Sequence, residues 1–217
     1  MQAAPDPALY HRWYDMPRGR WIGDVEFELV HRLLHPERGD SILDVGCGTG
    51  YFTHRFVLAG YRLTGVDPAI DWLAFAKAQA PEGERYVGGR AEHLPFPDRS
   101  FDHSFSIAAL CFMPDPKPGV AEMLRVTRRR FAVGLLNRQS LLYRQKGRGG
   151  GAGAYRGARW YTTEEIREFF AGLAIRNLRI RTAVFGPGAG VLARLAERLI
   201  PKAWPYGAFI VASGEIG

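Results

Sequence analysis

The stretch Ser41–Gly50, SILDVGCGTG, decides the fold of this chain. Its first five residues read as a short buried strand that carries one acid, Asp44. Alternating glycines then turn the chain, and a helical pattern begins at Tyr51. A strand, a glycine turn and a helix N-terminus let a ligand lie against bare backbone N–H groups, because glycine has no side chain in the way. The stretch therefore predicts a site for a nucleotide-like ligand.

Length and composition indicate one globular domain. The chain has 217 residues, of which 47% are hydrophobic and 24% charged, enough for one α/β domain with a core. No apolar run reaches the ~18–20 residues that span a bilayer, and the N-terminal sequence lacks the pattern of a secretory signal. The two cysteines, Cys47 and Cys111, allow neither a disulfide framework nor a CxxC metal pair. We therefore expect a cytoplasmic protein without a metal site.

The net charge of +7 is concentrated in one stretch. Residues 125–181 carry 14 Lys/Arg and 3 Asp/Glu, whereas the remainder carries 15 and 19. A basic surface attracts an anionic substrate or a nucleic acid. However, 25 of the 29 basic residues are Arg, so an Arg-rich composition explains the excess equally well. Both interpretations stay open at this point.

Strands alternate with helices along most of the chain, which is typical of a parallel sheet with helices on both faces. A helix over 191–200 separates the last two expected strands. The expected strands are 41–45, 61–66, 84–88, 101–107, 130–136, 178–185 and 206–213, and the helices between them include 51–59, 69–80, 119–126 and 166–170.

Two segments interrupt this alternation. Residues 10–23 are aromatic and basic and predict a helical turn and a loop over a site, before a helix over 24–34 capped by Asp24. Residues 144–159 are Gly-rich and basic and predict a flexible loop or lid. We expect a single domain made of an N-terminal helical cap (1–36), a cofactor-binding core (37–137), a substrate loop (138–162) and C-terminal helices and strands (163–217).

A second acid narrows the choice of ligand. Asp67 lies 21 residues after Gly46, at the end of the second strand, where an acid accepts hydrogen bonds from ribose hydroxyls. A dinucleotide fingerprint needs a third glycine where Tyr51 stands. Asp44 would also repel a pyrophosphate, by about 2–3 kcal/mol at ~6 Å with an effective dielectric of ~20. S-adenosylmethionine has no phosphate and carries positive charge, so it is favoured over NAD.

Three motifs, ILDVGCGTG, GVDP and AEHLPFPDRSFD, together resemble the class I S-adenosylmethionine-dependent methyltransferases, in the branch of the ubiquinone and menaquinone biosynthesis enzymes. The resemblance is strong over residues 40–135. It implies a Rossmann-like, doubly wound seven-stranded sheet, mostly parallel with an antiparallel C-terminal strand. The residues it places on the cofactor are Asp44, Gly46, Cys47, Gly48 and Gly50 at the methionine and ribose, Asp67 at the ribose hydroxyls, Pro68 or Ala69 beside the adenine, Ala91 and Glu92 at the adenine edge, and Ser106 and Ile107 along the methionyl portion.

The chain departs from the family at the adenine edge. The family often has Gly-Asp-Ala there, whereas this chain has Gly89-Arg90-Ala91-Glu92. Arg90 has only donors and cannot accept a hydrogen bond from the exocyclic amine. Glu92 or a backbone carbonyl must accept it instead, or the contact is lost, while the Ala91 N–H can still serve the ring.

Aromatic residues near the N-terminus have two interpretations. They are either ordinary packing or a lid over the sulfonium, because ring faces attract a desolvated cation. The lid interpretation adds Tyr14 to the cofactor-binding residues. The aromatic set is Tyr10, Trp13, Tyr14 and Trp21.

Methyl transfer from a sulfonium is an in-line displacement that needs alignment and exclusion of water. A base is needed only if the acceptor holds its proton tightly, so no catalytic residue is assigned; Tyr14, His93, Cys111 and Tyr161 are candidates. We expect a small or medium acceptor that bears a carboxylate or phosphate, bound by residues 10–23, the loop after Ile107 and residues 138–162, where Arg144, Arg148 and Arg156 supply paired donors. The alternatives are an RNA or protein methyltransferase, a non-catalytic S-adenosylmethionine-binding protein and a nicotinamide oxidoreductase. The oligomeric state stays open.

Overall fold

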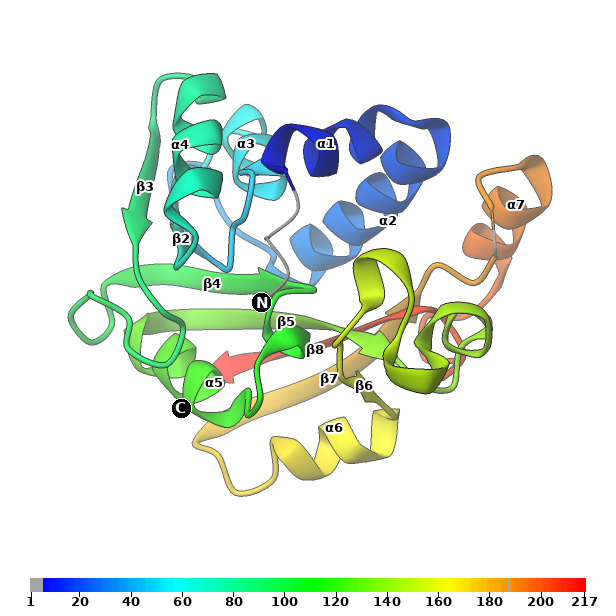
Figure 1. The fold of residues 1–217 in the computed structure, drawn as a ribbon. Helices are drawn as coiled ribbons and strands as arrows, with labels where there is room; N and C mark the ends of the chain where they lie inside the picture. The colour runs from blue at the N-terminus through cyan, green and yellow to red at the C-terminus, as the bar shows by residue number, and fades with distance from the viewer. Residues whose placement is uncertain (1–5, 187) are drawn as a thin grey trace.

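A computed structural model describes residues 6–186 and 188–217, so the first five residues of the expected helical cap lie outside the described part. One mixed sheet forms the centre of the molecule (Figure 1). In spatial order its strands are β3 (Glu84–Gly88), β2 (Arg62–Asp67), β1 (Ser41–Val45), β4 (Phe101–Ile107), β5 (Thr127–Asn137), β8 (Phe209–Ile216) and β7 (Ile175–Ala183), with the short β6 (Trp160–Tyr161) paired to the end of β5.

The direction of the strands confirms the predicted doubly wound sheet. β1 to β5 run parallel, and β8 is antiparallel to both of its neighbours, β5 and β7. Each parallel strand therefore ends at the same edge of the sheet. The chain order along the sheet reverses between β1 and β4, and a doubly wound sheet binds its ligand in the crevice at such a reversal.

Helices cover both faces of the sheet (Figure 1). One hydrophobic core lies under α2 and α3 and contains Phe56 and Phe105, whose rings stack at 4.7 Å. The other lies under α5 and α6 and contains Met123 and Ile166, both fully buried. The helices are α1 (Pro7–Arg12), α2 (Pro17–Leu34), α3 (Tyr51–Leu58), α4 (Ile70–Gln79), α5 (Lys117–Val126), α6 (Thr163–Phe169) and α7 (Val191–Leu199).

The N-terminal segment is more helical than the sequence predicts. α2 begins at Pro17, which suits a first helical position, and not at Asp24. Asp24 accepts a hydrogen bond from Arg55 instead of capping the helix. Gly19 and Gly23 lie inside α2, where other segments of the protein leave no room for a side chain. A Cβ atom would be 1.9 Å from the Trp13 carbonyl oxygen at Gly19 and 2.5 Å from the Tyr51 hydroxyl at Gly23.

Residues 138–162 also differ from the open loop that we expect. They form short helical turns, η3 (Tyr143–Gly147), η4 (Arg148–Gly150) and η5 (Gly153–Tyr155), before β6. The Trp160 ring packs on Tyr143 and Tyr155 at 5.3 and 5.5 Å, and the Arg159 N–H donates to the Cys111 carbonyl at 2.7 Å. This segment is therefore ordered and packs beside the end of β4. Within the described part of the chain, no helix combines the length and apolar character that crossing a bilayer requires.

Candidate cofactor and acceptor site

The glycine turn follows β1 and has a backbone that only glycine adopts readily. Gly46, Gly48 and Gly50 have φ values of 76°, 55° and 79°. A Cβ atom would be 2.3 Å from the Ala109 Cβ at Gly46 and 2.2 Å from the Tyr86 hydroxyl at Gly50. The glycines are therefore required both by conformation and by space.

The N–H groups of the turn are not bare, contrary to the sequence-based expectation. Gly46 and Cys47 both donate to the Val66 carbonyl, at 2.8 and 3.1 Å, and Gly50 donates to the Cys47 carbonyl at 2.9 Å. Gly48 donates to Asp67 at 2.9 Å. A phosphate site needs free N–H groups, so this turn suits a ligand that has no phosphate.

Asp44 is buried beneath the turn, where its Oδ2 accepts a hydrogen bond from the Thr53 hydroxyl at 2.7 Å. Burial raises the pKa of Asp44 to about 7, although the bond from Thr53 acts in the opposite direction. Burial thus opposes the permanent negative charge that we expect at this position. Asp44 instead joins β1 to α3 and becomes charged only near neutral pH.

Asp67 joins the turn to α4. Its two oxygens accept hydrogen bonds from the backbone N–H groups of Gly48, at 2.9 Å, and Ala69, at 2.8 Å. Burial raises its pKa, and these two bonds lower it. Each carboxylate oxygen has a second lone pair, so Asp67 can still accept from two adjacent hydroxyls. Its geometry fits both a helix-capping and a ribose-binding interpretation.

An exposed apolar residue, missed by sequence reasoning, lies beside this acid. Ile70, at the start of α4, is 65% exposed, and its Cδ1 is 3.2 Å from the position of a Cβ at Gly88. Pro68 is exposed next to it. An exposed Ile and Pro between the ends of β2 and β3 offer an apolar surface to a planar base. The signal for Ile70 was its place two residues after the GVDP motif.

The departure at the adenine edge has a structural consequence. The Arg90 guanidinium donates to Glu92 Oε1 at 2.9 Å and stays largely exposed. The Glu92 backbone and then Arg90 hold the pKa of Glu92 below its usual range. Glu92 is therefore an ionised acceptor with one oxygen left for a ligand, and Ala91 lies beside it, partly exposed. His93 is exposed.

The end of β4 completes the edge of the sheet. Ser106 is fully buried, and its hydroxyl has no hydrogen-bond partner among the described residues, so it supports the end of the strand from beneath. Ile107 is buried in the core under α2 and α3. Ala108 follows with a φ of 52°, and such strain in a non-glycine residue, of order 1–3 kcal/mol, is concentrated at functional sites. Sequence reasoning missed Ala108.

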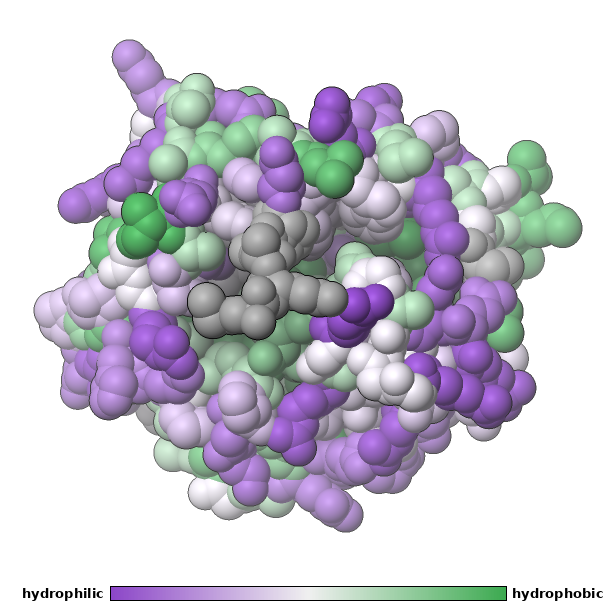
Figure 2. All heavy atoms as spheres, in the orientation of Figure 1, coloured by the Kyte–Doolittle hydropathy of each residue, from purple (hydrophilic) through white to green (hydrophobic). Residues whose placement is uncertain are grey.

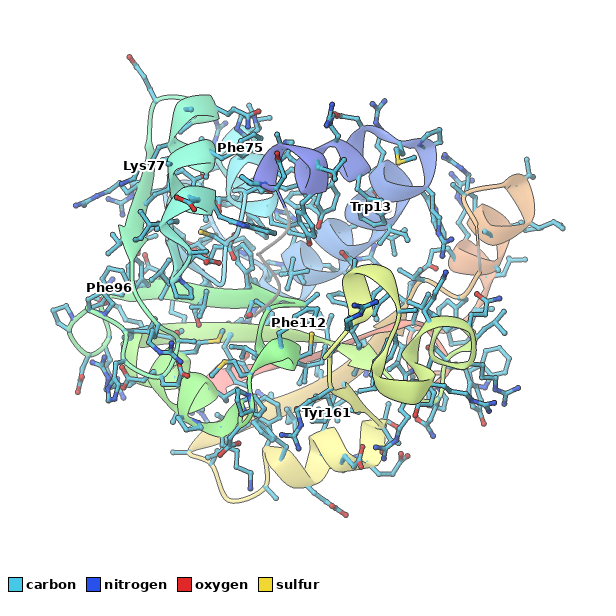
Figure 3. All side chains as sticks on the ribbon, in the orientation of Figure 1. Trp13, Phe75, Lys77, Phe96, Phe112 and Tyr161 are labelled. Carbon is cyan, nitrogen blue, oxygen red and sulfur yellow. The ribbon has the colours of Figure 1, made fainter. Side chains whose placement is uncertain are left out.

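The N-terminal helices close over the glycine turn. The His11 Nδ1 is 3.0 Å from the Thr49 hydroxyl, and the Tyr10 ring packs on Trp72 at 4.9 Å. Tyr14 is buried, and its ring stacks on Tyr51 at 3.7 Å. Figure 3 shows Trp13 on this side of the sheet edge, with Phe112 and Tyr161 on the opposite side. The cleft thus has an aromatic wall.

One carboxyl that sequence reasoning missed lies between this wall and the segment 138–162. Glu26, on α2, retains some exposed surface, yet burial raises its pKa to about 8. It has no hydrogen bond or ion pair among the described residues. Burial, and to a smaller extent Glu26, raises the pKa of side chains on α1, η1 (Trp13–Asp15), α3, η2 (Leu110–Phe112) and η5, so these five elements converge within electrostatic reach of the carboxyl. The side chains are Tyr10, Tyr14, Tyr51, Cys111 and Tyr155.

The four candidate bases from the sequence are poorly suited to that role. Burial raises the pKa of Tyr14 and Tyr161, and that of Cys111 to about 12. The Cys111 thiol also donates to the Ala108 carbonyl at 3.2 Å. His93 is exposed. A catalytic base works best with a pKa near the working pH, and Glu26 meets that condition better than Tyr14, Cys111 and Tyr161.

Comparison with known proteins shows similarity to methyltransferases. Residues 43–130 match the family described as a methyltransferase domain. An S-adenosylmethionine-dependent methyltransferase of Thermotoga maritima, described as a possible histamine N-methyltransferase, has a similar structure. It is 26% identical, with a TM-score of 0.78 over 97% of this chain and 96% of its own. A second such methyltransferase, from Aquifex aeolicus, shares the fold at 15% identity with a TM-score of 0.67, over 99% of this chain and all of its own.

Two sequence relatives are longer than this chain. An uncharacterized protein of Mycobacterium tuberculosis is 34% identical over 194 residues, which are 85% of this chain and 64% of the relative. The malonyl-[acyl-carrier protein] O-methyltransferase of Yersinia pestis is 36% identical over 108 residues, which are 48% of this chain and 40% of the relative. The chain therefore spans just under two thirds of the first relative and less than half of the second.

Proposed function

Since the chain carries a class I, S-adenosylmethionine-dependent methyltransferase domain, we propose that it transfers a methyl group to a small acceptor that has a proton to lose, such as an amine or a hydroxyl compound. The observation that supports this acceptor class is the unpaired carboxyl of Glu26 at the convergence of five elements. The cofactor supplies an electrophilic methyl group on a sulfonium.

We propose that the turn and the strand ends hold the cofactor. Asp67 accepts from the ribose hydroxyls, Ala91 and Glu92 contact the adenine edge, and Tyr14 forms part of the aromatic wall near the sulfonium. The fit rests on the positive φ values of the turn, its engaged N–H groups and the free lone pairs of Asp67. The remaining proposed contacts are Gly46, Cys47, Gly48, Gly50, Pro68 and Ile107, and the buried Asp44 and Ser106 support them from beneath.

In this proposal Glu26 receives the proton of the attacking group. Its pKa of about 8 means that a large fraction is protonated at neutral pH and that the carboxylate is formed in slightly basic solution. A carboxylate there also pairs with an ammonium and repels an acidic acceptor. The Thermotoga relative is described as a possible methyltransferase of an amine, which agrees with this acceptor class.

An acidic acceptor finds less support than the sequence suggested. Arg144 and Arg148, which we expected to bind it, are exposed on the outer side of η3 and η4. The malonyl-[acyl-carrier protein] relative acts on a carboxyl compound by its name, and it matches this chain over only 108 residues. We therefore place the amine or hydroxyl acceptor first.

The test is methyl transfer from S-adenosylmethionine to a panel of small amines, phenols and carboxylic acids. We expect amines or phenols to be methylated, and Glu26→Gln to lower kcat by about 10²–10⁴-fold, the usual range for a general base. Binding of S-adenosylhomocysteine should be unchanged in that variant, and Glu28→Gln, on the exposed side of α2, should behave as the wild type. Methylation of carboxylic acids alone would refute the acceptor class.

The cofactor site is tested separately. Asp67→Ala should weaken S-adenosylhomocysteine binding in calorimetry, because the ribose loses an acceptor, by about tenfold or more. Wild-type protein that binds neither S-adenosylmethionine nor S-adenosylhomocysteine would refute the whole proposal.

A further inference from the structure

The helix α7 has its apolar residues on the outside. Val191, Leu192, Leu195 and Leu199 are 81%, 82%, 49% and 70% exposed. Their spacing places them on one stripe of the helix. Figure 1 shows α7 standing away from the sheet, and Figure 2 shows hydrophobic atoms at the same edge of the molecule.

The inner side of α7 is held by polar contacts. Glu197 is buried, and its Oε2 accepts hydrogen bonds from the backbone N–H groups of Val184 and Phe185 at 2.9 and 3.1 Å. Lys202 donates to the other oxygen of Glu197. A surface helix of a soluble domain usually buries its apolar stripe and exposes its polar one, so the orientation of α7 is inverted and its apolar stripe has no partner within the described residues.

Basic and aromatic residues border the stripe. Arg194 and Arg198 lie next to it on α7 and are exposed. Trp204 and Tyr206, in the segment after the helix, are each 50% exposed. Trp and Tyr are enriched where one end of a side chain is apolar and the other is wet, as at a membrane surface.

The segment η3–η4 extends this surface. Arg144, Lys146 and Arg148 are exposed there, and Leu141 just before it is 47% exposed. One small cavity joins this segment to α2 and to the segments that precede and follow α7. Its lining includes Leu141, Gln145, Phe185, Tyr206 and Ile22. Ile22 lies one turn before Glu26, so the surface is next to the proposed acceptor site.

We propose that α7 and the η3–η4 segment together dock on the surface of an anionic lipid bilayer, with the apolar stripe of α7 in the headgroup region. Exposed leucines flanked by arginines and followed by Trp and Tyr are the composition of a helix that lies in such an interface. A convex, projecting helix fits a flat bilayer better than a groove in a protein. The proposal does not depend on which acceptor is methylated.

Vesicle flotation of the full chain tests this proposal. Neutral vesicles of phosphatidylcholine are compared with mixed vesicles of phosphatidylcholine and phosphatidylglycerol, at low and high salt. We expect binding to the mixed vesicles, weaker binding at high salt, and at least about tenfold weaker binding for the double variant Leu192→Ser/Leu195→Ser. Both leucines are exposed, so the variant should fold, which unchanged S-adenosylhomocysteine binding would verify.

The matched control is Leu58→Ser on α3, where the leucine is 72% exposed and lies away from this surface. It should bind vesicles as the wild type does. Wild-type protein that ignores the mixed vesicles, or a double variant that binds them equally well, would overturn the proposal. A dimer of the wild type that the double variant disperses, without vesicle binding, would show that a second copy of the chain covers the stripe.

Discussion

Glu26 has a pKa that links the proposed acceptor site to stability. The glutamate carboxyl of an unfolded chain has a pKa of 4.5, whereas burial raises the pKa of folded Glu26 to about 8. Between these values the unfolded chain binds fewer protons than the native one. The contribution of Glu26 to the free energy of unfolding is therefore complete at low pH and decreases as the pH rises through this window.

Glu26→Gln should remove that decrease. We expect the variant to gain stability relative to the wild type as the pH rises from about 4.5 to about 8, by up to about 5 kcal/mol at the upper end, because each pKa unit corresponds to about 1.4 kcal/mol. Urea unfolding at several pH values measures this difference. Asp44 makes the free energy of unfolding depend on pH in a similar way in both proteins, so its effect cancels in the difference. A gap that stays constant with pH would contradict the assignment.

Gly50 provides a second prediction at the scale of the residue. Gly50→Ala places a Cβ 2.2 Å from the Tyr86 hydroxyl at a φ of 79°, whereas Gly39→Ala meets nothing within 4 Å at a φ of 84°. Both variants carry the same backbone strain of about 1 kcal/mol. We expect Gly50→Ala to lose about 1–3 kcal/mol more by overpacking, and to bind S-adenosylhomocysteine poorly. Equal thermal shifts and equal calorimetric affinities for the two variants would disprove the steric argument.

The sequence predicted the cofactor side of the site better than the acceptor side. The glycine turn, Asp67 and the three motifs pointed to a class I methyltransferase and to S-adenosylmethionine, and both predictions are confirmed. These features can be recognised in the sequence because they depend only on the spacing of residues along the chain. Glu26 gave no such signal, because it stands among other acids of a helix and reads as part of the solvent-facing side. Only tertiary packing places η2 and η5 around it.

At the scale of elements, predictions were accurate where hydrophobic pattern and turn residues agree. The strands β1, β3 and β4 lie where predicted, and the Thr162 capping box begins α6. β8 begins at Phe209, three residues later than predicted. The preceding segment is kept as a loop because the Asn137 side-chain amide donates to the Pro205 and Gly207 carbonyls, both at 2.6 Å. A contact between residues so distant in sequence has no local signal.

The connection between α2 and α3 holds the N-terminal helices over the cleft. Arg55 donates to Asp24 at 2.6 Å and to the Tyr51 hydroxyl at 2.9 Å, and its guanidinium lies 4.6 Å from the Phe27 ring centre. Arg55→Met keeps the aliphatic stem but removes these interactions. We expect it to cost about 1–2 kcal/mol of unfolding free energy, since a partly exposed charged network is lost.

The same variant should also raise KM for S-adenosylmethionine, because the aromatic wall on α1 and η1 is less firmly held. Arg32→Met, at an exposed position of α2, is the matched control and should leave both quantities unchanged. Unfolding curves and initial rates measure them. An Arg55→Met protein as stable and as active as the control would show that α2 is held by its apolar contacts alone.

At the scale of the whole molecule, ion pairs account for much of the uneven charge distribution. Arginines of α5, β5 and the following turn belong to the basic stretch 125–181, and they pair with acids that lie mostly outside it. Neither a nucleic-acid surface nor an acceptor site is needed to account for them. The pairs are Arg125 with Glu122 and Asp98, Arg128 with Asp102, Arg129 with Asp40, Arg130 with Glu215 and Arg138 with Glu165.

The remaining basic residues, on η3 and η4, have two candidate roles: binding of an anionic acceptor and binding of an anionic lipid surface. The double variant Arg144→Glu/Arg148→Glu reverses two exposed charges outside the convergence around Glu26. We expect its turnover of a small amine or hydroxyl acceptor to stay within about twofold of the wild type, since exposed charges are screened beyond about 10 Å. Its binding to anionic vesicles should fall by about tenfold or more, because each reversal replaces attraction by repulsion. Parallel turnover and flotation measurements separate the two roles: a loss of turnover with unchanged flotation would restore the anionic acceptor and place these arginines in the acceptor site.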